Sequence, residues 1–293
     1  MDITLALGGG GAKGNAHLGV IRRLEKEGYK IRSVAGTSFG GIVAVLYAAG
    51  YNVDQIEEIF TSTDQGNLYA RDSRDGPSLL GLAGVRKMLD SALGGKTFHD
   101  LKLPCAVTAV DVKCATEVVI SKGLLREAVL ATIALPGIFS PMRMDNWELV
   151  DGGVLNPVPV SVARILSPDL PIVAVSLNDP LDTPLRTYAI PVPSIFPKPI
   201  ADRIHSLHYA QAFDIFMRAV DINSRAVAHY RLEADAPDVI IRPKIQDIGL
   251  LDRVVVRDVA KLGEEAVEEA LPQLKKATSW SSRMKKTLFG GKA

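Results

Sequence analysis

The segment IRSVAGTSFGGIVAVLYAAG, residues 31–50, has one serine at its centre, because Ser38 lies between Gly36 and Gly40 in the spacing G-x-S-x-G. The apolar run IRSVA predicts a buried strand, and IVAVLYAAG predicts a helix that ends at Gly50. A strand that turns sharply into a helix exposes the serine hydroxyl, and the glycines leave room for that turn. The segment therefore predicts an α/β fold with Ser38 as a candidate nucleophile, and an ordinary tight turn is the alternative.

The same alternation extends over most of the chain, where short runs rich in Val, Ile and Leu are separated by longer helical patterns. Such alternation favours a parallel sheet with helices on both faces. We therefore expect an α/β fold: a three-layer α/β/α domain with a mostly parallel central sheet and a helical C-terminal extension. The expected strands are 3–7, 31–35, 104–112, 117–121, 147–151 and 171–177. The expected helices are 13–27, 41–49, 53–61, 79–92, 124–134 and 158–166.

The composition excludes several classes of protein. A chain of 293 residues can bury the core of one large α/β domain, and a net charge of +1 gives no general case for a nucleic-acid partner. Cys105 and Cys114 lie in apolar segments, which fits a reducing compartment rather than a disulfide scaffold or a metal cluster. We find no signal peptide and no run of about 18 uncharged apolar residues, so we expect a cytoplasmic protein.

A second glycine cluster, GGGGAKG at residues 8–14, directly follows the expected strand 3–7. Its backbone N–H groups lead into a helix N-terminus and form a cradle for an anion. Gly9, Gly11 and Gly14 match the dinucleotide fingerprint G-x-G-x-x-G. That fingerprint requires an acidic residue about 20 positions further on, where this chain has AGTSFGG instead.

An oxyanion hole accounts for both glycine clusters better than a phosphate loop does. A phosphate loop places its lysine after the last glycine and before Ser or Thr, whereas here Lys13 precedes Gly14. Adjacent parallel strands end at the same edge of a sheet, so the loop after the first strand would lie beside Ser38. The amides of this loop would then face the reacting carbonyl.

A nucleophilic serine also needs a base, and Asp151 in ELVDGGVLNP follows the end of an expected strand. An Asp-Gly-Gly sequence alone commonly forms a turn in which the carboxylate caps local amides. A histidine base in the order typical of α/β-hydrolases would be His205, His208 or His229. None of them lies in a tight turn flanked by glycines, so we expect these histidines to be solvated or locally bonded. His17 is expected to pack in or near the core.

The blocks GGGGAKG, GTSFGG and DGG, in this order, resemble the three signature blocks of the patatin-like phospholipase family of serine acyl hydrolases. Two further segments are similar to that family: TAVDVKCATEVVI at 108–120 and ATIALPGIFSPM at 131–142. The resemblance extends from Ile3 to about Leu177. It identifies 1–177 as a patatin-like catalytic core.

The resemblance implies a Ser-Asp dyad without a histidine, in which Ser38 is the nucleophile and Asp151 is the base. It implies no metal and no cofactor. Lys13 stands where the family often has Arg, and we expect its ammonium to be solvated along the first helix. The implied oxyanion hole is formed by the amides around Gly9, Gly10, Gly11 and Ala12. The other motif positions are Gly14, Gly36, Gly40, Gly152 and Gly153.

The function implied by the resemblance is that of a lipid acyl hydrolase, an esterase of the phospholipase or lysophospholipase type that acts through an acyl-serine intermediate. Its partner would be a phospholipid or another lipid ester, and no nucleic acid. Two alternatives stay open. One is a dinucleotide-binding oxidoreductase that uses residues 9–14, and the other is a catalytically idle scaffold that binds a membrane or a protein.

The C-terminal part divides into three segments. Residues 178–206 form a proline-rich loop whose apolar side chains are expected to cap the acyl-binding cleft. Residues 207–270 are expected to complete the domain with helix and strand. Residues 271–293 contain no Asp or Glu but six Lys and Arg, and we expect a basic amphipathic tail that anchors peripherally to an anionic membrane. The apolar face of that tail comprises Ala277, Trp280, Met284 and Leu288.

Overall fold

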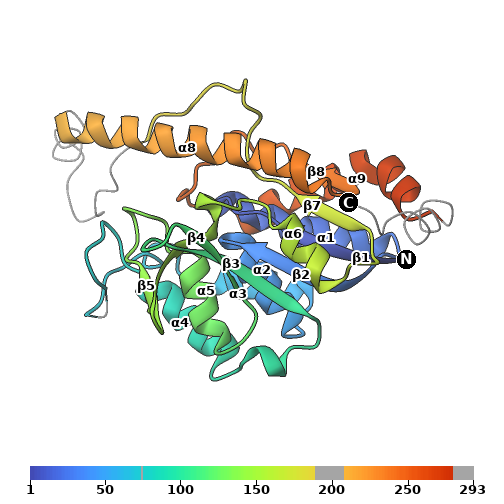
Figure 1. The fold of residues 1–293 in the computed structure, drawn as a ribbon, viewed down its shortest axis with the longest axis horizontal. Coiled ribbons are helices and arrows are strands. Elements are labelled where there is room, and N and C mark those ends of the chain that lie inside the picture. The colour runs from blue at the N-terminus through green and yellow to red at the C-terminus, as the bar shows by residue number, and fades with distance from the viewer. Residues whose placement is uncertain (74, 189–207, 280–293) are drawn as a thin grey trace.

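The computed structural model describes residues 1–73, 75–188 and 208–279, and an eight-stranded sheet lies at its centre (Figure 1). The strand order is β5-β6-β3-β2-β1-β7-β8, with β4 also paired to β3. Strands β3, β2, β1, β7 and β8 pair in parallel, and β4, β5 and β6 form the antiparallel pairs. The strands are β1 (Asp2–Leu7), β2 (Lys30–Thr37), β3 (Cys105–Asp111), β4 (Thr116–Ile120), β5 (Met142–Met144), β6 (Trp147–Asp151), β7 (Ile172–Val175) and β8 (Val239–Ile241).

Helices cover both faces of this sheet, so the predicted three-layer α/β/α architecture is confirmed. They are α1 (Ala16–Lys26), α2 (Phe39–Ala48), α3 (Val53–Ser62), α4 (Ala83–Leu93), α5 (Leu125–Thr132), α6 (Val160–Leu166), α8 (His208–Asp235) and α9 (Val256–Ala277). Three short 3-10 turns are η1 (Gly11–Asn15), η2 (Phe98–Asp100) and η3 (Gly152–Val154). Figure 1 shows α8 as a long helix along one side of the domain.

The alternation of side chains along β1 explains the two layers of core. Ile3, Leu5 and Leu7 are fully buried on the face covered by α1, α2 and α9. Ala6 faces the opposite side, where it packs with α6 and with Leu232 of α8. Large residues on one face and alanine on the other allow α6 to approach the sheet closely, because successive side chains of a strand point to opposite faces.

The boundaries of several elements differ from the sequence-based expectation. The helix expected from residue 13 begins at Ala16, because the preceding glycine loop forms the 3-10 turn η1. The helix expected from residue 79 begins at Ala83. Strand β5 was not expected, and for β8 only a strand somewhere within 207–270 was expected, since each has three residues and is too short to show a periodic pattern.

The C-terminal helix α9 belongs to the domain and packs against α1. It continues past residue 271, where the basic tail was expected to start, because Leu274 is fully buried in the main core. The apolar face expected for that tail falls mainly on residues 280–293, which lie outside the described residues. Among the helices of the described part, none combines the length and the apolar character that crossing a membrane requires.

Candidate active site

Ser38 sits in a strained conformation at the turn between β2 and α2. Its φ of 54° and ψ of −127° lie in a region that residues with a side chain rarely adopt. Gly40 is required here, because a Cβ at that position would lie 2.3 Å from the carbonyl oxygen of Leu7. The Ser38 N–H donates to Thr132 Oγ1 at 2.8 Å, which holds the turn. The chain therefore stores strain at one half-buried serine.

Asp151 lies at the end of β6 and contacts that hydroxyl directly. Ser38 Oγ donates to Asp151 Oδ2 at 2.5 Å, and Gly153 N–H donates to Oδ1 at 2.7 Å. The carboxyl is 4% exposed. Burial raises the pKa of Asp151 to about 6, although the hydrogen bonds from Ser38 and Gly153 oppose that rise. Asp151 thus has both roles: Oδ1 caps the turn at Gly153, and Oδ2 accepts the hydrogen bond from Ser38.

The glycine loop lies beside Ser38, as the parallel pairing of β1 and β2 predicts. A Cβ at Gly9 would lie 3.0 Å from the Cβ of Ser38. Two of the four candidate amides are engaged, because Gly9 N–H donates to Pro157 O at 2.9 Å and Ala12 N–H donates to Leu250 O at 2.8 Å.

The other two candidate amides belong to Gly10 and Gly11. Within the described part of the chain, neither N–H donates a hydrogen bond. Gly11 has a φ of +56°, and a Cβ there would lie 2.1 Å from the carbonyl oxygen of Leu250. The loop conformation therefore requires glycine at this position, and it leaves two donors free on residues that line the same cavity as Ser38.

His17 forms a hydrogen bond with the backbone of the glycine loop. Its ring is fully buried, and Nε2 donates to Gly8 O at 2.8 Å because a carbonyl can only accept. Burial lowers the pKa of His17 to about 4, so the ring is neutral near pH 7. The expectation of core packing is met, and the contact with Gly8 could not be read from the sequence.

The other histidines of the described residues do not approach Ser38. His99 and His208 are exposed, and His229 lies 3.4 Å from Glu233 on the same helix. None of the three lines the cavity that contains Ser38 and Asp151. His205 lies outside the described residues.

Ser38 and Asp151 share a cavity of about 490 Å³ with the glycine loop. Its walls come from the loop before β5, from α8 and from the segment 248–251. The start of the expected cap also lines it, through Asn178, Asp179, Arg186 and Tyr188. The apolar cap residues Ile190, Val192, Ile195 and Phe196 fall outside the described residues. Apolar lining side chains include Ile133, Leu135, Phe139, Leu177, Phe216, Met217 and Leu250.

The ammonium of Lys13 is not solvated, so the expectation for this residue was wrong. Its Nζ lies 3.0 Å from Asp179 Oδ2, and the two side chains are 10% and 7% exposed. Asp179 also contacts Arg225 at 3.3 Å, and Arg225 contacts Asp221 at 2.7 Å. This buried network of four charges connects the glycine loop to the segment 178–188 and to α8. No signal in the sequence links Lys13 to a residue so far along the chain.

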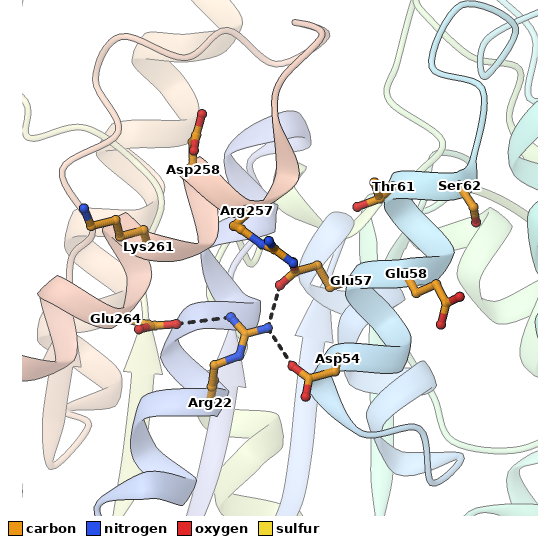
Figure 2. A pocket seen from close by; sticks show the side chains of 10 residues that line it. All are labelled: Arg22, Asp54, Glu57, Glu58, Thr61, Ser62, Arg257, Asp258, Lys261 and Glu264. Carbon is orange, nitrogen blue, oxygen red and sulfur yellow. Dashed lines mark hydrogen bonds and ion pairs between the residues drawn. The ribbon is translucent and has the colours of Figure 1, made fainter.

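A wider cleft of about 840 Å³ lies between α1, α3 and α9 (Figure 2). Figure 2 shows the ion pairs of Arg22 with Asp54, Glu57 and Glu264. Glu57 also pairs with Arg257 at 3.1 Å. These contacts cross-link three helices, and neither Ser38 nor Asp151 lines this cleft. We therefore assign it a structural role and regard the smaller cavity as the candidate active site.

A strained serine, a buried aspartate and a glycine loop line one cavity of a three-layer α/β/α domain, and together they define the candidate active site. The model of the patatin-like phospholipase family matches residues 5–164, which is more than half of the chain. The chain belongs to this family, as the three sequence blocks predicted.

Relatives and a solved structure agree with this assignment. An uncharacterized NTE family protein of Mycobacterium tuberculosis is 36% identical over 187 residues, which cover 63% of this chain and 51% of that protein. Patatin-like phospholipase domain-containing protein 6 of Mus musculus is 28% identical over 195 residues, covering 64% of this chain and 14% of that protein. This chain thus matches about half the length of the mycobacterial relative. The crystal structure of VipD from Legionella pneumophila, at 12% identity, has a TM-score of 0.50 over 92% of this chain and 66% of that chain, which supports the fold alone.

Proposed function

We propose that this chain is a lipid acyl hydrolase in which Ser38 is the nucleophile and Asp151 is the base. The observation that carries the proposal is the hydrogen bond of 2.5 Å between Ser38 Oγ and a buried Asp151. The free amides of Gly10 and Gly11, which line the same cavity as Ser38, support an oxyanion hole. Family membership and the apolar cavity walls favour a phospholipid or another lipid ester as the substrate.

The reaction has two halves. Ser38 Oγ attacks the ester carbonyl as Asp151 Oδ2 takes its proton, and the glycine amides bind the oxyanion of the tetrahedral intermediate. The intermediate then collapses to an acyl-serine and the alcohol leaves with the proton. Water attacks the acyl-serine in the second half, with Asp151 again as the base, and the fatty acid is released.

Because Asp151 is a weak base, we ask whether proton transfer or electrostatic stabilisation supplies most of the rate enhancement. A carboxylate with a pKa of about 6 accepts a proton more readily than a solvated aspartate, but it is still a weak base for a serine hydroxyl. Removing one oxyanion donor in a well-studied protease costs about 100-fold to 1,000-fold in kcat. We therefore assign most of the rate enhancement to the two free amides and the strained, preoriented serine.

A fluorophosphonate probe tests the proposal directly. It should form a covalent adduct with Ser38, which peptide mass spectrometry would locate. The Ser38→Ala variant, with its fold checked by circular dichroism, is the matched control and should not react. A folded wild-type protein without an adduct at Ser38 would contradict the hydrolase assignment and favour a catalytically idle scaffold.

The raised pKa of Asp151 predicts the pH dependence. A base must be unprotonated, so kcat/KM on a water-soluble p-nitrophenyl ester should rise about tenfold per pH unit below about pH 6 and level off above it. The pH profile of kcat/KM reports the pKa of the base in the free enzyme. An unchanged rate from about pH 5 to about pH 8 in the folded protein would argue against Asp151 as the base.

The basic tail gives a separate prediction for membrane binding. Deleting residues 278–293 should weaken binding to anionic vesicles at low salt, because each basic residue near such a surface contributes about 1 kcal/mol. Added salt should remove the difference, since it screens surface attraction. Hydrolysis of soluble esters should be unchanged. A truncated protein that binds anionic vesicles as tightly as the full chain would refute an anchor in this segment.

A further inference from the structure

Helix α8 presents an apolar stripe to solvent. Between residues 212 and 222 its exposed apolar side chains recur three and four positions apart, and Ile215, Phe216 and Ile222 are 67%, 50% and 50% exposed. The same helix buries other apolar residues on its inner side. A helix that packs on one domain has a single apolar face, so the second face of α8 calls for a partner. The stripe comprises Ala212, Ile215, Phe216, Ala219 and Ile222.

This stripe is continuous with the candidate active site. Phe216 and Ala219 are exposed, and both also line the cavity that contains Ser38. A Cβ at Gly137 would lie 3.7 Å from Phe216 Cε1, so the phenyl ring reaches the loop before β5. Because Phe216 is half exposed and lines the cavity, its ring stands at the cavity opening. Whatever covers the stripe therefore covers the entrance to the site.

Two exposed leucines extend the apolar surface beside α8. Leu181 and Leu185 are 49% and 38% exposed. They belong to the segment 178–188, which is tied to α8 by a hydrogen bond of 2.8 Å from Arg225 Nη1 to Thr183 O. This segment also lines the cavity. Exposed apolar groups thus occur both on α8 and on the segment 178–188, and both of these parts of the chain contribute residues to the cavity lining.

The charged side chains next to the stripe form ion pairs of opposite sign. The charged residues of α8 from 212 to 222 are Asp214, Arg218 and Asp221, and Arg218 pairs with Asp214 at 2.5 Å. Asp221 pairs with the buried Arg225. A face with paired charges does not select an anionic partner, which distinguishes it from the basic tail. It suits a surface that is itself neutral overall.

We propose that the stripe, together with Leu181 and Leu185, docks on the surface of a lipid aggregate with zwitterionic headgroups. The inference rests on the proposed function, because the docked lipid is also the substrate. A second copy of this chain on the stripe would obstruct the cavity entrance at Phe216, whereas a lipid surface there delivers an ester to Ser38. The apolar side chains enter the headgroup region, and the substrate leaves the aggregate along Phe216 without crossing water.

The test compares exposed isoleucines that do not line the cavity. The double variant Ile215→Ser/Ile222→Ser should bind phosphatidylcholine vesicles at least about tenfold more weakly than wild type in a flotation assay at high salt. It should hydrolyse vesicle lipid correspondingly more slowly, while kcat/KM on a soluble p-nitrophenyl ester stays within about twofold. Ile165→Ser on α6 is the matched control, since Ile165 is 76% exposed and does not line the cavity, and it should bind like wild type.

Several outcomes would overturn the inference. The inference is wrong if the wild-type protein does not float with phosphatidylcholine vesicles. It is also wrong if the double variant floats with them as well as the wild type does. Light scattering that shows a dimer in the wild type and a monomer in the double variant would assign the stripe to a second copy instead. Fluorophosphonate labelling of Ser38 in the same samples reports the proposed function separately, so its failure is distinguishable from a failure of docking.

Discussion

Ser38→Ala and Asp151→Asn are each expected to lower kcat on a soluble ester by about 1,000-fold or more, and the double variant should be no worse than the single ones. The two side chains share one hydrogen bond of 2.5 Å and act as a unit, so removing either leaves the other without its role. Steady-state kinetics measures the loss, and circular dichroism confirms that the variants fold. His208→Ala and His229→Ala are matched controls and should retain activity. If either abolished activity in a folded enzyme, a triad would replace the dyad.

The Asp151→Asn variant should also show that the ionised carboxylate of Asp151 lowers the free energy of unfolding. The pKa of Asp151 is raised from 3.8 to about 6, so folding favours the protonated carboxyl. Its contribution to stability is present at low pH and is lost as the pH rises from about 4 to about 6. The Asn variant lacks this loss, so its Tm relative to wild type should increase over that range. A difference in Tm that does not change with pH would contradict the raised pKa.

Gly19→Ala and Gly263→Ala are expected to destabilise the fold by about 3 kcal/mol or more each, because α1 and α9 cross with their backbones in contact. A Cβ at Gly19 would lie 1.7 Å from Ala260 O, and a Cβ at Gly263 would lie 2.0 Å from Ala16 O. Alanine favours a helix over glycine by about 1 kcal/mol, but that gain is smaller than the cost of separating two buried helices.

Thermal unfolding measures this effect. The loss should lower Tm by about 5 °C or more for a domain of this size. Gly95→Ala is the matched control, because a Cβ there meets nothing within 4 Å. Equal Tm values for the three variants would show that α1 and α9 do not cross as closely as described. The outcome also bears on the domain's extent, because α9 lies beyond the region that the family model matches.

Much of the fold could be predicted from the sequence because its signals are local. The strand before Ser38, the helix after it and the glycine loop after β1 each follow from a short run of residues. The alternation of strand and helix patterns predicted the layers. Elements of three residues carry too few side chains for a periodic pattern, so β5 was missed and β8 could not be located within 207–270. Lys13 also has no local signal that distinguishes a buried ion pair from a solvated ammonium.

Ser38, Asp151 and the glycine loop could be recognised as candidates without a structure, since each belongs to a short motif of turn-forming residues. Which amides of the loop remain free depends on long-range packing, because Gly9 and Ala12 donate to Pro157 and Leu250, residues that are distant in the chain. The same packing also decided that Lys13 meets Asp179 and that α8 turns a second apolar face outward. Such contacts depend on where the packed core brings remote segments together, and no local pattern records that.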